Sequence, residues 1–305
     1  MYMSESKLYL GVEVGDHYMK VALVDATAKM VVKAAVLPAE TNPIYDIFLF
    51  ESMLQQWVDE NQIKDIEATS VTMPATMSII RKVYVPQEAV ASKSQYLKWY
   101  MELFTNADVS AYVVDSITLS GDDTLGYNEL IMAVRKEWVD ALRKGFRSRV
   151  LSPKSMEVDV LSLMNVMDVG EKIKDAVCVV KADFTGVTLA WMRRDELLAL
   201  RCVSTLSMVG KTEEMAYPIL ANEIVEQMKL VQSENSVNGV TDVRLCGEMA
   251  SNEQFVNILM EKLSDYKVSL MTNLSQLPCD ESVNPVDMIC CVGAVGAALN
   301  QMEGV

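Results

Sequence analysis

The sequence predicts an α/β protein made of two related halves, and two observations carry this prediction. The first is a run of three predicted strands at 8–14, 18–25 and 30–38, in which an acidic turn joins the first two. The second is the return of the same order at 176–204, about 165 residues later, again with an acidic turn after the first strand. Such a repeat indicates an internal duplication and hence a two-lobed fold.

The opening strand pair contains the first candidate site. Its valines suit a pleated, half-buried sheet, and Gly15 permits the positive φ that a tight hairpin turn needs. Glu13 lies two residues before this glycine, beside backbone N–H groups that such a turn leaves free. The pair is therefore either a cradle for a metal-bound phosphate or an ordinary hairpin, and these residues alone favour the hairpin.

The first half, expected at 1–172, continues with a helix and two strands that each stop at a proline. After the second proline the pattern changes to a small α+β block, which we expect to be an inserted subdomain at about 87–160. The expected elements are a helix at 44–61, strands at 67–73 and 79–85, a helix at 87–103, strands at 111–119 and 125–134, a helix at 136–147, a strand at 155–160 and a helix at 158–169.

The second half, expected at 173–305, repeats the three-strand run and adds alternating helices and strands. The last helix is rich in glycine and alanine, so we expect it to pack closely on a sheet. The expected elements are strands at 176–182, 187–192 and 196–204, a helix at 212–233, a strand at 242–246, a helix at 252–263, a strand at 267–271 and a helix at 287–300.

Composition excludes several classes of function. A net charge of −15 and a pI near 4.6 give no counterion-release gain on nucleic acid and no attraction to anionic membranes. No run approaches the roughly 18 apolar residues of a transmembrane helix, and the first residues lack a signal-peptide core. The six cysteines show no metal spacing and are expected to be reduced thiols. The sequence therefore predicts a cytoplasmic protein.

Other motifs favour ordinary structural roles. His17, the single histidine, is more typical of an exposed polar residue than of a general base. Asp16 with Glu13 and Asp183 would bind Mg²⁺, although acidic surface turns are common. The Cys290-Cys291 pair is more typical of buried thiols than of a strained vicinal disulfide. No Ser-His-Asp set, metal-ligand cluster or Walker-type loop supports another enzyme class.

Four patches, taken in order, resemble the actin-like (ribonuclease H-like) ATPase superfamily. Within it the chain resembles the PilM-type proteins of type IV pilus assembly, relatives of FtsA and of the cytoplasmic part of GspL-type secretion proteins. The patches are Gly11-Val12-Glu13-Val14-Gly15 with Lys20-Val21; Met73-Pro74-Ala75 with Arg81 and Pro86; the inserted block ending in Met156-Glu157-Val158-Asp159; and 230–263 with Val243-Arg244-Leu245-Cys246-Gly247. The resemblance implies a duplicated actin-like two-lobed fold with an inserted small α+β subdomain in the first half.

The resemblance also implies a set of nucleotide-binding positions, several of which depart from the family pattern. The family has Asp where this chain has Glu13, and Ser or Thr where it has Asp16; its second Asp-x-Gly turn is Asp183-Phe184-Thr185 here. A carboxylate near a triphosphate costs on the order of several kcal/mol when partly desolvated. The implied, degenerate cofactor-binding positions are Glu13, Gly15, Asp16, Lys20, Asp183, Thr185, Gly186, Gly247 and Glu248.

A helical subdomain that forms one wall of the adenine pocket in the family is mostly missing here, because Ser204 leads to the next helix within a short loop. We therefore expect no catalytic residue, no metal and no cofactor, with bound ATP and magnesium as the alternative. The function implied is a cytoplasmic scaffold of a type IV pilus or related secretion machine. Its partner would be the N-terminal cytoplasmic tail of a PilN-type bitopic membrane protein, which recruits the chain to the inner membrane without direct insertion. The alternatives are a functional Mg-ATP-binding ATPase and a sugar kinase of the same superfold.

Overall fold

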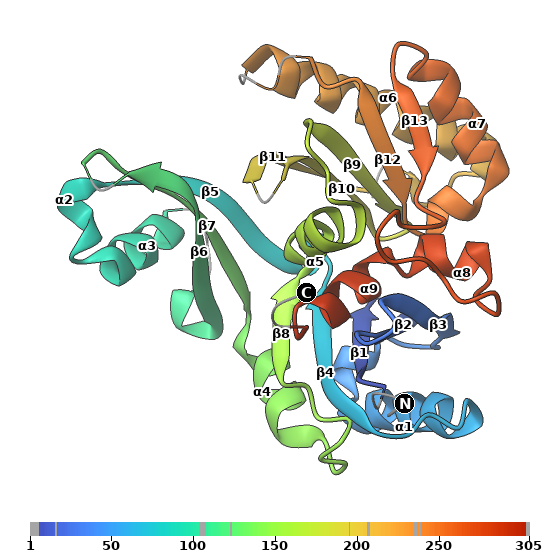
Figure 1. Cartoon of the computed structure of the whole chain (residues 1–305). Coiled ribbons are helices and arrows are strands. Elements are labelled where there is room, and N and C mark those ends of the chain that lie inside the picture. The colour runs from blue at the N-terminus through green and yellow to red at the C-terminus, as the bar shows by residue number, and fades with distance from the viewer. Residues whose placement is uncertain are drawn as a thin grey trace.

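Two five-stranded sheets form the centre of the molecule (Figure 1). The computed structural model describes residues 6–15, 17–103, 108–122, 124–194, 196–205, 208–234, 237 and 239–302. The first sheet has the order β3-β2-β1-β4-β8. Its strands are β1 (Leu8–Val14), β2 (Tyr18–Asp25), β3 (Met30–Pro38), β4 (Ile66–Met73) and β8 (Ser155–Val158).

The second sheet has the corresponding order β11-β10-β9-β12-β13. In both sheets an antiparallel three-strand meander is extended by strands that run parallel to its first strand. The duplicated, two-lobed α/β architecture predicted from the repeated meander is therefore confirmed. The strands are β9 (Val177–Asp183), β10 (Gly186–Arg193), β11 (Glu196–Val203), β12 (Asp242–Cys246) and β13 (Lys267–Leu270).

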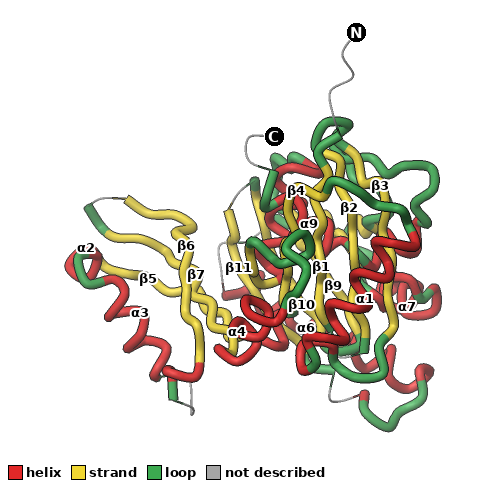
Figure 2. Tube along the Cα trace, turned by 90° about the horizontal axis from the view of Figure 1, so that it is seen from below, coloured by secondary structure: helices red, strands yellow, loops and turns green. Residues whose placement is uncertain are grey.

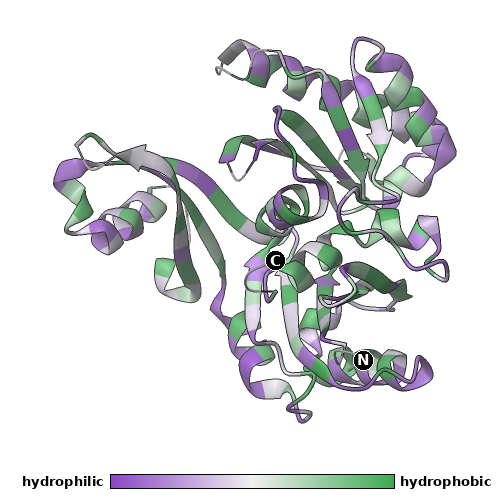
Figure 3. Ribbon diagram, in the orientation of Figure 1, coloured by the Kyte–Doolittle hydropathy of each residue, from purple (hydrophilic) through white to green (hydrophobic). Residues whose placement is uncertain are grey.

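Helices cover the faces of both sheets and fill the space between them (Figures 1 and 2). Apolar residues concentrate on the central strands and on the helix α9 (Val292–Leu299), which is buried along its whole length (Figure 3). The other helices around these two sheets include α1 (Ile47–Glu60), α5 (Asp159–Asn165) with the π-helical turn Val166–Glu171, α6 (Glu213–Glu234), α7 (Glu253–Lys262) and α8 (Pro285–Cys290).

The small residues of α9 allow its close approach to β1 and α5, as expected from the sequence. A Cβ atom on Gly11 would lie 1.8 Å from the carbonyl oxygen of Ala294. A Cβ atom on Gly296 would lie 2.0 Å from the carbonyl oxygen of Ser162. These contacts are backbone against backbone, so neither position can accept a larger residue without movement of a whole element.

A third, three-stranded sheet of order β5-β7-β6 projects to one side of the two large sheets (Figures 1 and 2). Its strands are β5 (Ser78–Pro86), β6 (Tyr112–Asp122) and β7 (Gly126–Arg135), accompanied by α2 (Gln87–Val90), α3 (Lys93–Glu102) and α4 (Lys136–Gly145). The strand expected at 79–85 belongs to this sheet. The strand expected at 155–160 does not, because β8 pairs with β4 in the first large sheet.

Three expected helices also differ from the structure. The helix expected at 87–103 is interrupted at Ser92, whose φ of −118° and ψ of 28° are not helical and whose hydroxyl donates to the Ala89 carbonyl. The helix expected at 287–300 begins earlier, at Pro285, where the Asn284 side chain accepts from the Val286 N–H, and it breaks at Cys291. The helix expected at 158–169 begins at Asp159 and widens into the π-helical turn.

None of the helices that the structure describes combines the length and the apolar character of a membrane span.

Candidate functional site

The two large sheets meet at a buried group of charged side chains. Lys20 on β2 donates to Glu13 on β1 at 3.2 Å and to Asp183 on β9 at 2.7 Å. Lys181 on β9 lies 2.9 Å from Glu13, 3.5 Å from Asp159 at the start of α5, and against Asp183. Each lysine therefore binds carboxylates from both sheets. We call this the ion cluster; it comprises Glu13, Lys20, Asp159, Lys181, Asp183 and Glu248.

The ion cluster is almost fully removed from solvent. The exposed fraction is 0% for Lys20 and Glu13 and 2% for Lys181 and Asp183. A buried charge costs several kcal/mol unless an opposite charge and hydrogen bonds compensate it. Each ammonium group here has more than one carboxylate neighbour, so the fold tolerates the two lysines only in this arrangement.

Glu248 closes the cluster at its rim. It follows Gly247, which has a φ of +95° and lies against β9; a Cβ there would lie 2.5 Å from the Ala182 carbonyl oxygen. The Glu248 N–H donates to Asp183 at 2.9 Å, and its carboxylate accepts from the Phe184 N–H at 3.2 Å. Backbone donors of the second acidic turn and of the turn after β12 are thus bonded to the chain's own carboxylates.

The first acidic turn is covered by Tyr18. The Gly15 N–H donates to the Tyr18 carbonyl at 3.1 Å, and a Cβ on Gly15 would lie 2.1 Å from the tyrosine ring. The same ring lies 4.6 Å from the Lys20 ammonium group, within the range of a cation–π contact. Tyr18 therefore occupies the space beside Gly15 that a ligand of this turn would need.

The pKa values of the cluster follow from its burial and its pairing. Burial alone lowers the pKa of Lys20 and of Lys181, but Asp183 and Glu13 outweigh it and hold both values well above the ordinary range. Burial alone raises the pKa of Asp183, yet Lys181 and Lys20 hold it below its usual range. Both lysines are therefore charged, and Asp183 is ionised, at neutral pH.

Two acidic groups of the cluster shift in the other direction. Burial raises the pKa of Glu248 to about 7, against the opposing effect of Lys20. Burial also raises the pKa of Asp159, against the effect of Lys181. Among the described residues, Glu13 Oε2 and Asp159 Oδ1 are buried without a hydrogen-bond partner. In its ionised form, neither carboxylate offers a donor to an anionic phosphate.

The structure brings together four of the positions named from the sequence. Glu13, Lys20, Asp183 and Glu248 share the ion cluster. Gly15, Gly186 and Gly247 mark close packing, since a Cβ on Gly186 would lie 2.2 Å from Thr76 Cγ2. Thr185 is part-buried beside exposed Phe184, His17 is exposed, and Asp16 lies outside the described residues. Within the described ranges, no three His, Cys, Asp or Glu side chains form a metal-binding group.

Lys181, Asp159 and Tyr18 were not predicted as part of this site. Lys181 did carry a signal, because it is the only charged residue in the interior of the apolar strand that begins at Val177. A lysine in such a strand requires a buried carboxylate partner, and Asp183 and Glu13 are the partners here.

The carboxyl group of Glu157 should make the stability of the fold depend on pH. Burial raises its pKa to about 7 from 4.5, although the Ser162 hydroxyl donates to it at 2.5 Å and opposes the shift. The folded chain holds this proton more tightly than the unfolded chain, so the free energy of unfolding falls as pH rises from about 5 to 8. We expect Glu157→Gln to remove on the order of 2 kcal/mol of this fall, measured by urea unfolding at both pH values.

The control for this pH test is Glu60→Gln, the same replacement at an exposed site on α1. Part of the slope persists in Glu157→Gln through Glu248. Equal slopes in wild type and Glu157→Gln would contradict the assignment.

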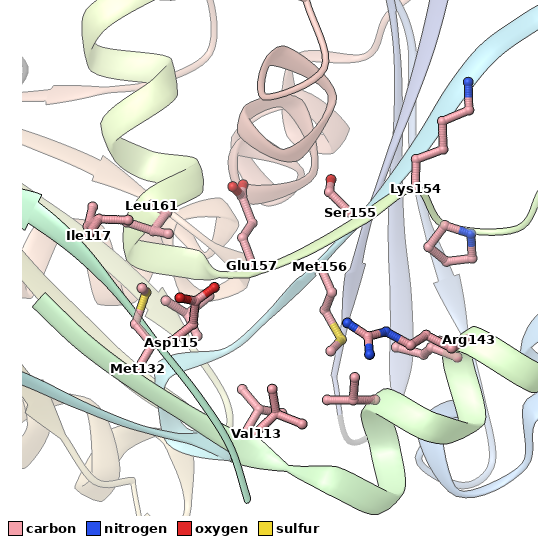
Figure 4. Close-up of a pocket in the computed structure, with 15 residues that line it drawn as sticks. Val113, Asp115, Ile117, Met132, Arg143, Lys154, Ser155, Met156, Glu157 and Leu161 are labelled. Atoms are coloured by element: carbon pink, nitrogen blue, oxygen red, sulfur yellow. The ribbon is translucent and has the colours of Figure 1, made fainter. Parts of the chain in front are cut away.

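A second candidate site is a groove of about 320 Å³ between β6 and β8 (Figure 4). Its floor is one face of the three-stranded sheet and its side is α4, and both contribute mostly apolar side chains. The apolar lining includes Val113, Ile117, Met132, Val134, Val139 and Leu142. No local pattern in the sequence predicts this groove, because its lining comes from three separate segments.

β8 presents an unpaired edge to this groove, since it is the last strand of its sheet in the described chain. The Lys154 N–H donates to the Thr69 carbonyl at 2.8 Å, so positions 154, 156 and 158 direct their backbone groups toward β4. Because these groups alternate along a strand, the N–H and C=O groups of Ser155 and Glu157 face away from β4. Met156 points into the groove (Figure 4).

No protein-family model matches the sequence, and no curated protein matches it. The structure is similar to a chain of the PilM-PilN type IV pilus biogenesis complex, with a TM-score of 0.72 and 15% identity over 97% of this chain and 98% of that one. It is also similar to a Bacteroides thetaiotaomicron protein with an actin-like ATPase fold and unknown function, with a TM-score of 0.52 and 9% identity over 94% and 95%.

The chain has the actin-like ATPase fold. The cytoplasmic domain of EpsL, an inner membrane component of the type II secretion system of Vibrio cholerae, shares it with a TM-score of 0.54 and 12% identity over 97% of this chain and 94% of that one. The ion cluster includes Glu13, Lys20, Asp183 and Glu248, four of the positions that the sequence resemblance implies for nucleotide.

Proposed function

We propose that this chain is a cytoplasmic scaffold of a type IV pilus or related secretion machine. It binds the N-terminal cytoplasmic tail of a PilN-type bitopic membrane protein, which recruits it to the inner membrane. The observation that carries the proposal is the structural likeness to the chain of the PilM-PilN complex, which extends over nearly the whole of both chains. The likeness to the EpsL cytoplasmic domain, from another inner membrane machine, supports the same class of function.

The groove between β6 and β8 suits an extended tail. A peptide strand added to β8 would bond to the outward backbone groups of Ser155 and Glu157. Its alternate side chains would then pack on the apolar face that includes Val113, Ile117 and Met132. Main-chain bonds at an open edge with apolar contacts beside them are the usual means by which short segments bind.

The second part of the proposal is that nucleotide binding has been lost. Lys20 and Lys181 form ion pairs with carboxylates of the chain. The backbone N–H groups of Phe184 and Glu248 donate to the chain's own carboxylates. The Tyr18 ring covers Gly15. A nucleotide would have to displace these buried ion pairs and would then face additional acidic groups.

Partner binding is tested with a synthetic peptide of the N-terminal cytoplasmic residues of the bitopic protein encoded beside this chain. Isothermal titration should show micromolar or tighter binding to the full chain. Met156→Arg should weaken it about tenfold or more, because a charged side chain would fill the apolar groove. Leu125→Arg, the same kind of change at a residue that is 68% exposed in the turn between β6 and β7, should bind as wild type. Failure of the wild-type chain to bind the peptide would overturn the proposal.

Loss of nucleotide binding is tested by titration with Mg-ATP. We expect neither heat of binding nor a rise in Tm at about 1 mM nucleotide, since a ligand well above its Kd stabilises the fold measurably. Glu248→Gln, which removes one acid from the rim, should likewise not restore binding, because the two lysines remain paired. Micromolar affinity in the wild-type chain would instead support a working ATPase.

A further inference from the structure

Two opposite charges stand out in the otherwise largely apolar groove between β6 and β8. Asp115 lies on β6 between Val113 and Ile117, on the face that lines the groove. Arg143 extends from the last turn of α4, after the buried Leu142. Both side chains are exposed. The ion pairs of the described chain include neither of them, and the Asp115 carboxylate accepts from the N–H of its neighbour Ser116 at 2.8 Å.

The two charges stand on opposite sides of Met156 (Figure 4). Asp115 lies toward the end of the groove that contains Glu157 and Leu161, whereas the Arg143 guanidinium turns into the groove from the α4 side. The other cation of the lining, Lys154, donates to the Glu67 carbonyl at 2.6 Å and extends away from Arg143. The other acid of the lining, Glu157, lies at the same end as Asp115. The groove is therefore acidic at one end and basic at the other.

An electrically polar groove discriminates between the two directions in which an extended peptide can lie. Backbone bonds to an open strand edge and apolar contacts permit either direction, because parallel and antiparallel pairing are both stable. Charges across an interface fix the register and exclude wrong arrangements by placing like charges together. Asp115 and Arg143 line the groove together with its apolar floor, so an extended peptide packed on the floor passes both charged side chains.

We propose that Asp115 and Arg143 set the direction and register of the tail bound in this groove. The tail places a lysine, an arginine or its own α-amino group at Asp115, and an acidic side chain or a free carbonyl at Arg143. This inference rests on the proposed function, and it names the recognition elements of the partner: a short extended segment with apolar residues that separate a basic end from a polar or acidic one.

The test exchanges the two charges, Asp115→Arg with Arg143→Asp, and measures binding of the tail peptide by fluorescence anisotropy. The exchange keeps net charge and reverses the polarity of the groove, so we expect affinity to fall more than about tenfold. A peptide whose basic and acidic residues are exchanged should recover binding to this variant and lose binding to the wild-type chain. Glu88→Lys, at an exposed site on α2, is the control for a change of charge outside the groove.

The outcomes separate this inference from the proposal on which it rests. If the wild-type chain binds no tail peptide, the proposed function fails. If it binds and the charge-exchanged variant binds the native peptide with wild-type affinity, the assignment of Asp115 and Arg143 is overturned and the proposed function stands. Both replaced side chains are exposed, so an unchanged Tm is expected and confirms that the variant is folded.

Discussion

Replacement of Lys181 with alanine should destabilise the fold by roughly 3–5 kcal/mol. The change leaves the carboxylates of Glu13, Asp159 and Asp183 in a buried site with one ammonium group fewer. Coulomb repulsion between these carboxylates then adds to their desolvation. Guanidinium unfolding of the full chain at pH 7 measures the loss.

The matched control is Lys229→Ala, which removes an exposed lysine from α6 and should change stability by less than about 0.5 kcal/mol. A double-mutant cycle with Asp183→Asn isolates the pair: the double variant should lose less than the sum of the two single variants. A loss below about 1 kcal/mol in Lys181→Ala would show that the ion cluster contributes little to holding the two sheets together.

The second large effect is expected at Gly11, where even alanine should cost more than about 3 kcal/mol. Its Cβ would lie 1.8 Å from the Ala294 carbonyl oxygen and 2.7 Å from the Ala298 N, both backbone atoms of α9. No rotamer change can relieve a clash with backbone, so α9 would have to move away from β1. We expect a fall in Tm of many degrees in a thermal unfolding scan.

Gly170→Ala is the comparison for this change. Its Cβ would lie 3.0 Å from Leu274 Cδ1, the end of a flexible side chain that can give way. We expect less than about 1 kcal/mol there. Similar losses at Gly11 and Gly170 would mean that the approach of α9 to β1 is looser than the structure has it.

The duplicated meander could be predicted from the sequence because each strand carries its own local pattern. The valine-rich strand pair, the turn at Gly15 and the recurrence after Asp183 are local signals, and the sheets follow them. Sheet membership is not local. The strand expected at 155–160 was predicted as the last strand of the inserted block, but Ser155–Val158 pairs with residues 70–73 of the first large sheet, which no periodicity reveals.

The candidate sites likewise combine features that the local sequence indicates with features that depend on distant parts of the chain. The acidic turns marked Glu13 and Asp183 from sequence, yet the cations that neutralise them were not interpreted as their partners. Lys181 and Asp183 are neighbours on one strand face, whereas Lys20 reaches Asp183 across 163 residues. The groove could not be predicted from any local pattern, because its edge is β8, its floor is the three-stranded sheet and its side is α4.

The ion cluster has a consequence for how the chain folds. Its members come from residues 13 to 248, so it completes only after most of the chain has been synthesised. Before that point, each lysine lacks some of its carboxylate partners and is expected to stay hydrated. An intermediate in which the cluster is open to solvent is therefore favoured over one in which the first half is closed. Docking of the two halves and expulsion of water from the cluster are then one late, cooperative event with high contact order.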